Sequence, residues 1–425
     1  MGAAVAALLA VAGCSSSSRP SPHTTTAAIG CRPTVAKLVT LTQRYLDGVA
    51  ADTQIPGLVT ASPTPSTSAS ASPSASPVSQ QDYVDAITNA RAQLPAVGCS
   101  QAAFTEAMQS GLQTVRPHGA IAGAVLDQLR AQLRGDFPTT AVTRRAGPHD
   151  DLAQVLAELP PKSTLLLAAG TYRLPDTLVL LRSITIRGAG SGKSVLTSAT
   201  ANAAVLVLTD QPVTLSGVAL RRTGTAPGSV VVTGPTAAIS FRDVAVSGAR
   251  AASSGGAGGV GVLLTAVGAP FTNRTVTFRA VNSSFSGNDS AGVAAGGTHH
   301  VVITGSTFAQ NRQCGVCYLG ASTGTVSGST FTSDVVGVVV SSEAPVAIEH
   351  NHFQGGDVGI QATGQAKPTV TNNVLKGTAR ASMVFVGTSA GTVDGNDCSG
   401  DRAGIAVART AYPYVKKNAC RVTLG

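Results

Sequence analysis

Apolar and polar residues follow two different patterns along the chain, and the change falls near residue 148. Before it, apolar residues recur at helical spacing, as Val35, Leu38, Tyr45 and Val49 do. After it, short runs with an apolar residue at every second position predominate, such as Ile184-Thr-Ile186. The patterns predict a small α-helical domain over residues 31–137 and an all-β domain over residues 148–425.

Residues that favour helix starts support the first assignment. Ser79 and Asp82 have the spacing of a capping box. Ser100 stands before the next helical pattern, and Pro117 before the last one. Residues 59–80 are rich in Ser, Thr, Ala and Pro and have too few apolar residues to fold, so we expect a disordered internal loop there.

A repeat of 22 or 23 residues dominates the second domain. Its most regular column is apolar: Phe285, Phe308, Phe331, Phe353, Leu375, Cys398 and Cys420. Two residues before each member stands Ser or Asn: Ser283, Ser306, Ser329, Asn351, Asn373, Asn396 and Asn418. A Gly followed by Val or Ile recurs after most members: Gly292, Gly315, Gly337, Gly359 and Gly404. The coil of Leu375 has Ser382 in place of this glycine.

Columns at one fixed period predict a solenoid whose coils stack about 4.8 Å apart. The apolar column then fills the interior. Asn at a tight corner tolerates the left-handed conformation, and its amide can bond the Asn of the next coil. The glycines mark corners that need positive φ or a close approach of the backbone.

The start of this domain adds a second signature. Asp150 and Asp151 precede a short amphipathic helix, and the strand sequence KSTLLLAAGTYRL follows. The entry and the columns resemble the parallel β-helix repeat family, which contains pectate lyases, polygalacturonases and NosD-like surface proteins. There the helix caps the first coil, whose bare edge would invite aggregation. The resemblance covers about residues 150–420. It implies a right-handed parallel β-helix of about ten coils, but it does not imply one activity.

The N-terminus carries a targeting pattern. Residues 2–13 are apolar or small, too few to span a bilayer, and lead into Cys14. Val11-Ala12-Gly13-Cys14 resembles a bacterial lipobox, although no Lys or Arg precedes the apolar run. The resemblance implies a signal peptide over 1–14, a diacylated Cys14, a Ser/Thr/Pro tether over 15–30, and anchoring at the outer face of a bacterial cell membrane. The alternative is an ordinary cleaved signal with an incidental Cys.

Six cysteines remain, an even number that is typical of disulfides in an exported protein. Cys31 and Cys99 bracket the disordered loop, and a bond between them would join the two halves of the helical domain. Cys398 and Cys420 lie one period apart in the interior column, within reach of a bond between adjacent coils. Cys314 and Cys317 have CxxC spacing, which without a second CxxC favours a local disulfide or two free thiols over zinc. We therefore predict no metal site.

The formal charge of +9 suggests an anionic partner. Lys and Arg are scattered rather than clustered, which argues against nucleic acid. Outside a cell, dispersed Arg favours anionic wall polymers or lipid headgroups. We expect a monomer.

The strand after the recurrent glycine is where we look for catalysis in such a fold. Its outward column contains neither carboxylate nor base: Ala294, Cys317, Val339, Gln361, Val384 and Ala406. The turn before this strand is richer: Asn288-Asp289, Asn311-Arg312, Asp334, Asp357, Arg380 and Asp401-Arg402. Arg312, Asp334, Asp357, Asp401 and Arg402 are the candidate site residues. They are suited to holding Ca²⁺ or gripping sugars, although Asn and Asp also favour turns for backbone reasons alone.

Three hypotheses follow. The first is a surface-anchored module that binds cell-wall or extracellular polysaccharide. The second is a carbohydrate-active enzyme, either a polysaccharide lyase or a glycoside hydrolase that works with two carboxylates. The third is a NosD-like module for protein interaction or metal delivery. No cofactor is required by the sequence, and Ca²⁺ enters only if the protein is a lyase. The bare strand face favours binding over catalysis.

Overall fold

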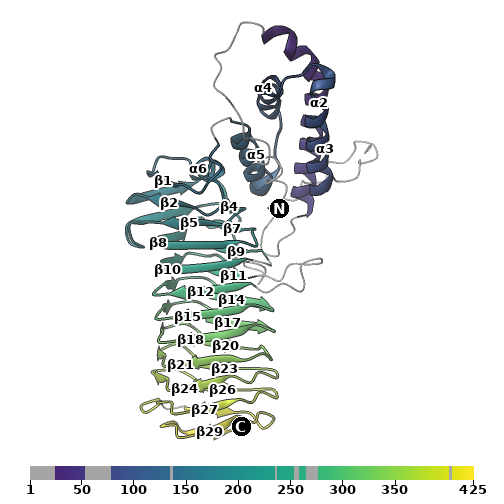
Figure 1. The fold of residues 1–425 in the computed structure, drawn as a ribbon. Coiled ribbons are helices and arrows are strands. Elements are labelled where there is room, and N and C mark those ends of the chain that lie inside the picture. Colours follow the sequence, from purple (N-terminus) through teal and green to yellow (C-terminus); the bar gives the residue numbers. More distant parts are fainter. Residues whose placement is uncertain are drawn as a thin grey trace, which may run out of the picture. The chain divides into compact units, whose positions relative to one another are not determined.

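Two compact units make up the chain, one helical and one built of β-strands (Figure 1). The computed structural model describes residues 24–52, 78–134, 137–234, 237–252, 258–264, 276–401 and 404–425. The predicted signal peptide with Cys14, most of the predicted loop 59–80, and Arg402 lie outside these ranges.

The helical unit contains five α-helices and a short 3₁₀ helix among the described residues. They are α2 (Thr24–Asp52), α3 (Gln80–Gln93), η1 (Pro95–Val97), α4 (Gln101–Leu112), α5 (Gly119–Leu133) and α6 (Leu152–Ala157). Helix α2 begins inside the segment predicted as a tether, so the tether does not extend to residue 30. None of the described helices is both long enough and apolar enough to cross a membrane.

Helix caps follow the predicted residues in two of three cases. Ser79 Oγ accepts a hydrogen bond from the amide of Asp82 at 3.1 Å, and Ser100 Oγ accepts one from Ala103 at 3.2 Å. The expectation that Pro117 opens the next helix is wrong, because α5 begins at Gly119 with His118 at the N-cap.

A buried contact between α2 and α3 organises the helical core. The rings of Tyr45 and Tyr83 stack with their centroids 4.6 Å apart, and the Tyr83 hydroxyl lies 2.9 Å from Thr42 Oγ1. The predicted disulfide between Cys31 and Cys99 is present, with the two Cα atoms 5.1 Å apart. It joins α2 to the residue just before the Ser100 cap of α4.

The β unit is a solenoid whose coils contain up to three short parallel strands. One column of third strands forms an 11-stranded sheet. It consists of β4 (Leu178–Leu180), β7 (Val205–Val207), β9 (Val231–Thr233), β11 (Val262–Leu264), β14 (Ala291–Gly297), β17 (Cys314–Gly320), β20 (Val336–Val340), β23 (Val358–Ala362), β26 (Ala381–Phe385), β28 (Ile405–Val407) and β30 (Val422–Leu424).

First and second strands form a 19-stranded sheet. The first strands are β1 (Thr143–Ala146), β2 (Ser163–Leu167), β5 (Ile184–Arg187), β12 (Thr277–Val281), β15 (His300–Thr304), β18 (Thr323–Ser327), β21 (Val346–Glu349), β24 (Thr369–Thr371), β27 (Thr392–Asp394) and β29 (Tyr414–Lys416). The second strands are β3 (Gly170–Leu174), β6 (Ser194–Ser198), β13 (Ser284–Ser286), β16 (Thr307–Ala309), β19 (Thr330–Thr332), β22 (His352–Gln354) and β25 (Val374–Lys376). Two long strands, β8 (Pro212–Arg222) and β10 (Ala238–Ser247), pair with both columns.

The solenoid starts earlier than predicted. Strand β1 begins at Thr143 and pairs in parallel with β2, although the sequence pattern placed the boundary at residue 148. Helix α6, which lies between these two strands in sequence, groups with the helical unit. The apolar run expected as one strand is divided into β2 and β3.

The predicted interior column is confirmed. Rings of Phe285, Phe308, Phe331 and Phe353 stack with centroid spacings of 4.9, 4.8 and 4.7 Å. The recurrent glycines serve close approach rather than positive φ in most coils. A Cβ at Gly315 would lie 2.7 Å from Phe331 Cδ1. In the coil of Leu375 this position is Ser382, whose Oγ donates to Asp401 Oδ2 at 2.6 Å.

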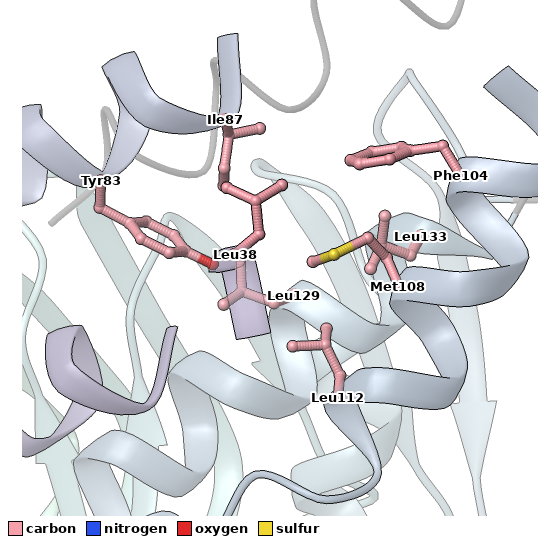
Figure 2. A pocket seen from close by; sticks show the side chains of 8 residues that line it. All are labelled: Leu38, Tyr83, Ile87, Phe104, Met108, Leu112, Leu129 and Leu133. Carbon is pink, nitrogen blue, oxygen red and sulfur yellow. The ribbon is translucent and has the colours of Figure 1, made fainter. Parts of the chain in front are cut away.

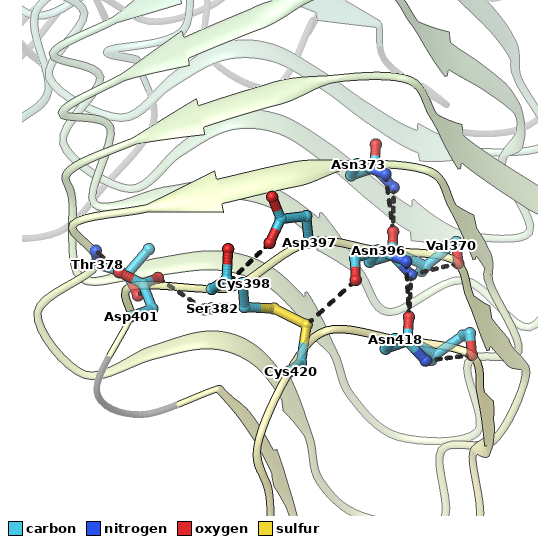
Figure 3. Close-up of a disulfide and its surroundings, with 12 residues drawn as sticks. Val370, Asn373, Thr378, Ser382, Asn396, Asp397, Cys398, Asp401, Asn418 and Cys420 are labelled. Carbon is cyan, nitrogen blue, oxygen red and sulfur yellow. Dashed lines mark hydrogen bonds between the residues drawn. A yellow bond between two sulfur atoms is a disulfide. The ribbon is translucent and has the colours of Figure 1, made fainter.

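The Ser/Asn column forms a hydrogen-bonded ladder along the axis. Asn351 Nδ2 donates to Asn373 Oδ1 at 3.0 Å, and Asn373 Nδ2 donates to Asn396 Oδ1 at 2.9 Å. Figure 3 shows the ladder continuing from Asn396 to Asn418. The left-handed conformation belongs to the preceding residue of each corner, such as Asn372 with φ 54°, and not to the ladder residue as we expected.

Candidate functional site

The turns between second and third strands bring charged side chains to one edge of the solenoid. Six positions of successive turns define what we call the charged corner: Arg250, Asp289, Arg312, Val335, Asp357 and Arg380. Backbone hydrogen bonds fix each turn on the one before it, for example from the Arg312 amide to the Asn288 carbonyl at 3.1 Å. The sheet therefore sets the positions of these side chains.

Charges alternate along the corner in two groups. Asp289 Oδ1 lies 3.4 Å from Arg250 Nη1 and 3.7 Å from Arg312 Nε. Asp357 Oδ2 accepts from Arg380 Nε at 2.9 Å. Val335 stands between the groups and is exposed. The Arg312 side chain is 75% exposed, so its guanidinium is accessible to a ligand despite its ion pair.

Asp334 does not face solvent with this group, and that part of the sequence prediction is wrong. The residue is 3% exposed. Its Oδ1 accepts hydrogen bonds from the amide of Asn311 at 2.8 Å and from Asn311 Nδ2 at 2.7 Å. Desolvation raises the pKa of the Asp334 carboxyl to about 7, against the opposing effect of these hydrogen bonds. Asp334 ends an interior ladder that begins at Asn288.

Asp401 also has a structural position. Its Oδ2 accepts from Thr378 Oγ1 at 2.7 Å and from Ser382 Oγ at 2.6 Å, and its Oδ1 accepts from the Thr378 amide at 3.1 Å (Figure 3). These bonds tie the turn of Asp401 to the coil before it. Of the predicted site residues that the structure describes, only Arg312 and Asp357 belong to the charged corner.

The outer face of the 11-stranded sheet adjoins this corner. Register pairs confirm the predicted outward column from Ala294 through Cys317, Val339, Gln361 and Val384 to Ala406. Apart from Gln361, the side chains of this described column are small or aliphatic, and none of them is an acid or a base. Within the described ranges, no three His, Cys, Asp or Glu residues gather closely enough to hold a metal ion.

Two disulfides lie in the solenoid. Cys398 and Cys420 are joined across adjacent coils, as predicted, with Cα atoms 4.7 Å apart (Figure 3). Cys314 and Cys317 form a local disulfide within β17, with Cα atoms 6.0 Å apart. The local bridge was one of two alternatives that the sequence left open.

An apolar cavity in the helical unit is too small to be a ligand site. Figure 2 shows its lining side chains from α2, α3, α4 and α5. They are Leu38, Tyr83, Ile87, Phe104, Met108, Leu112, Leu129 and Leu133. The cavity volume is about 10 Å³, which is room for roughly one water molecule. We regard it as a gap in the core packing.

Comparison with known proteins identifies the architecture of the solenoid. The family described as "Right handed beta helix region" matches residues 261–420. The β unit is a right-handed β-helix. A search of curated proteins gives no match.

Solved structures with a similar arrangement include enzymes and a viral protein. Pectate lyase Pel9A is 13% identical, with 66% of this chain and 78% of that chain covered and a TM-score of 0.40. ORF18 of Geobacillus virus E2 is 11% identical, with 76% and 65% covered and a TM-score of 0.45. The catalytic unit of the GH87 α-1,3-glucanase of Streptomyces thermodiastaticus strain HF3-3 is 15% identical, with 67% and 69% covered and a TM-score of 0.41. At such low identity the likeness concerns the fold alone.

One member of the charged corner was missed from the sequence. Arg250 lies in a Gly- and Ala-rich insertion of the β-helix, where the coil period is interrupted. A usable signal is local: Gly248 has φ 84°, the conformation that Gly287 adopts at the next turn. Counting two residues from each such glycine leads to Arg250 and Asp289.

Proposed function

We propose that the chain is a surface-anchored module that binds an anionic cell-wall or extracellular polysaccharide along the charged corner. The observation that carries the proposal is the alternation of Arg and Asp side chains at the spacing of the coils. The aromatic stack measures that spacing at 4.7–4.9 Å, close to the length of one sugar unit in an extended chain.

The side chains of the corner suit a sugar acid. A guanidinium recognises a carboxylate through paired hydrogen bonds, and the Asp partners accept from sugar hydroxyls. Each exposed ion pair contributes only about 0–1 kcal/mol to stability, so exchanging one for a ligand contact costs little. Several weak contacts along one polymer then add up through their high effective concentration.

Anchoring belongs to the same proposal. A diacylated Cys14 would hold the chain at the outer face of a bacterial membrane, next to wall polymers. The net charge of +9 favours attraction to such anionic polymers.

Binding is favoured over catalysis by the burial of Asp334. Asp334 has a pKa of about 7, which fits a general acid or base, but its burial separates it from a bound polymer. The accessible acids of the corner, Asp289 and Asp357, are both in ion pairs with Arg.

Glycan binding by the full chain tests the proposal, with polygalacturonate and alginate as anionic probes and dextran as a neutral one. We expect binding of an anionic probe that weakens between about 50 and 300 mM salt, because the Debye length shortens. Arg312→Gln/Arg380→Gln should lose about tenfold in affinity, and Arg221→Gln, an exposed Arg elsewhere, should not. Equal binding by the double variant and the wild type would place the site away from the corner.

A further inference from the structure

Two tyrosines of the last coil differ from every other described aromatic residue. Tyr412 is 70% exposed and Tyr414 is 63% exposed, whereas none of the other aromatic residues in the described ranges is exposed. Large aromatic side chains usually bury their area in a core or an interface. Two of them at the surface, separated in sequence by a single residue, therefore point to a ligand.

The backbone that carries both rings is fixed by its neighbours. Their order is Tyr412-Pro413-Tyr414, and the proline ring restricts φ between them. The amide of Tyr412 donates to the Ser389 carbonyl at 2.8 Å, and the amide of Tyr414 donates to the Gly391 carbonyl at 2.8 Å. Little conformational freedom remains to be lost on binding, apart from the side-chain torsions.

A column of Thr side chains, interrupted by one Ala, leads along the first strands to Tyr414. Strand register aligns Thr325, Ala347, Thr369, Thr392 and Tyr414 on the outer face. We call this column the threonine lane. The parallel column contains Ser327, Glu349, Thr371, Asp394 and Lys416. These polar groups face the same side of the 19-stranded sheet, at coil spacing.

A cation stands beside the platform. Lys416 Nζ lies 5.5 Å from the centroid of the Tyr414 ring and 3.3 Å from Asp394 Oδ2. Lys417 follows and is exposed. An acidic group on a ligand that covers the ring would therefore meet Lys416 and be attracted to it.

We infer that Tyr412 and Tyr414 form an aromatic platform that stacks against the C–H face of a sugar ring, with the polysaccharide chain running along the threonine lane. The partly positive C–H edges of a sugar are complementary to the electron-rich face of an aromatic ring. Hydroxyl side chains of the lane exchange hydrogen bonds with sugar hydroxyls, and Lys416 selects an acidic sugar. The inference rests on the proposed function for its ligand class, but Tyr414 lies at the start of the first strand β29 and Tyr412 just before it, and neither belongs to the charged corner.

The experiment compares binding of polygalacturonate, alginate and dextran by full-length variants. Tyr412→Ala/Tyr414→Ala should lower affinity for an anionic probe about tenfold or more, and Tyr412→Phe/Tyr414→Phe should keep it because the rings remain. Leu424→Ala is the matched control, since Leu424 is 79% exposed in the same coil. The melting temperature should stay unchanged in all three. Because the chain has no Trp, its tyrosine emission can be measured directly. We expect this emission to change when the wild type binds.

The outcomes separate this inference from the proposed function. If the alanine double variant binds as the wild type does while Arg312→Gln/Arg380→Gln loses binding, the platform is overturned and the charged corner stands. If the tyrosine variant loses binding and the arginine variant does not, the platform stands and the charged corner falls. If the wild type binds none of the anionic probes, both are overturned.

Discussion

Asn311 donates to a single oxygen of Asp334 twice, once from its backbone amide at 2.8 Å and once from Nδ2 at 2.7 Å. The other carboxyl oxygen, Asp334 Oδ2, is buried without a hydrogen-bond partner. An amide at this position would accept the same two bonds on its oxygen. The ladder from Asn288 through Asn311 therefore ends at Asp334. When the Asp334 carboxyl is ionised, its second oxygen has no hydrogen-bond donor.

The unfolding free energy should depend on pH through Asp334. Its carboxyl has an ordinary pKa of 3.8 and a folded pKa of about 7, so the folded chain binds the proton more tightly than the unfolded chain. Protonated Asp334 therefore contributes to the stability of the folded chain at low pH, and this contribution is lost as pH rises from about 4 through 7. Asp334→Asn should therefore stabilise the protein, by about 2–3 kcal/mol more at pH 8 than at pH 5.

Urea unfolding of wild type and Asp334→Asn at both pH values measures this difference. Charged neighbours in the adjacent turns, Arg312 and Asp357, are present in both proteins. Asp357→Asn is the control, because Asp357 lies in an exposed pair with Arg380. Equal gains for Asp334→Asn at the two pH values would show that Asp334 is not the titrating group.

Phe331→Ala should lower the free energy of unfolding by about 3–5 kcal/mol, because it opens a cavity between two stacked rings. The centroids of Phe308 and Phe353 lie 4.8 and 4.7 Å from that of Phe331. Ser333→Ala, at an exposed turn position, should stay within about 0.5 kcal/mol. Equal melting temperatures for the two variants would contradict the interior position of Phe331.

Gly315→Ala should destabilise the solenoid by about 1–3 kcal/mol through overpacking. Its Cβ would lie 2.7 Å from both Phe331 Cδ1 and the Gly337 carbonyl oxygen, and neither can move freely inside a coil. Gly296→Ala is the matched control on the neighbouring strand, since a Cβ there meets nothing within 4 Å. Thermal unfolding of both variants tests this role of Gly315. Equal melting temperatures for Gly315→Ala and Gly296→Ala would contradict it.

Period alone was enough to predict the interior of the β-helix, because residues one coil apart lie directly above one another. Phe285 and Phe308 are adjacent in space for that reason. The turns were harder, since coils of 22 and 23 residues shift side chains by one position. Asp334 and Asp357 lie 23 residues apart, yet one is interior and the other is in an exposed ion pair. In an extended chain such a one-residue shift exchanges the two faces.

Exposure could not be read from the sequence either. Tyrosine is often a core residue, so the sequence does not mark Tyr412 and Tyr414 as surface residues. Their exposure in the structure is what makes them candidates for binding.

Removing the two solenoid disulfides should have unequal effects. Cys398→Ala/Cys420→Ala opens a link over 22 residues, and the chain-entropy relation assigns it roughly 3 kcal/mol. Cys314→Ala/Cys317→Ala opens a link over only 3 residues within β17, for which the same relation gives roughly 2 kcal/mol or less. Denaturant unfolding under non-reducing conditions compares the variants. A larger loss for the Cys314 and Cys317 variant would show that the local bridge stabilises the fold beyond its loop entropy.

The last prediction concerns the proposed lipid anchor at Cys14. A diacylated Cys14 brings two acyl chains, and stable membrane attachment generally takes two such signals, since one chain gives only reversible binding. We expect membrane attachment to depend on these acyl chains. In a bacterial host, the wild type should partition into the detergent phase, and globomycin should block its processing. Cys14→Ala should move to the aqueous phase, whereas Cys314→Ala/Cys317→Ala, which removes two cysteines far from the N-terminus, should partition as the wild type does. A Cys14→Ala protein that stays with the membrane would contradict lipidation and would leave the dispersed positive charge as the source of attachment.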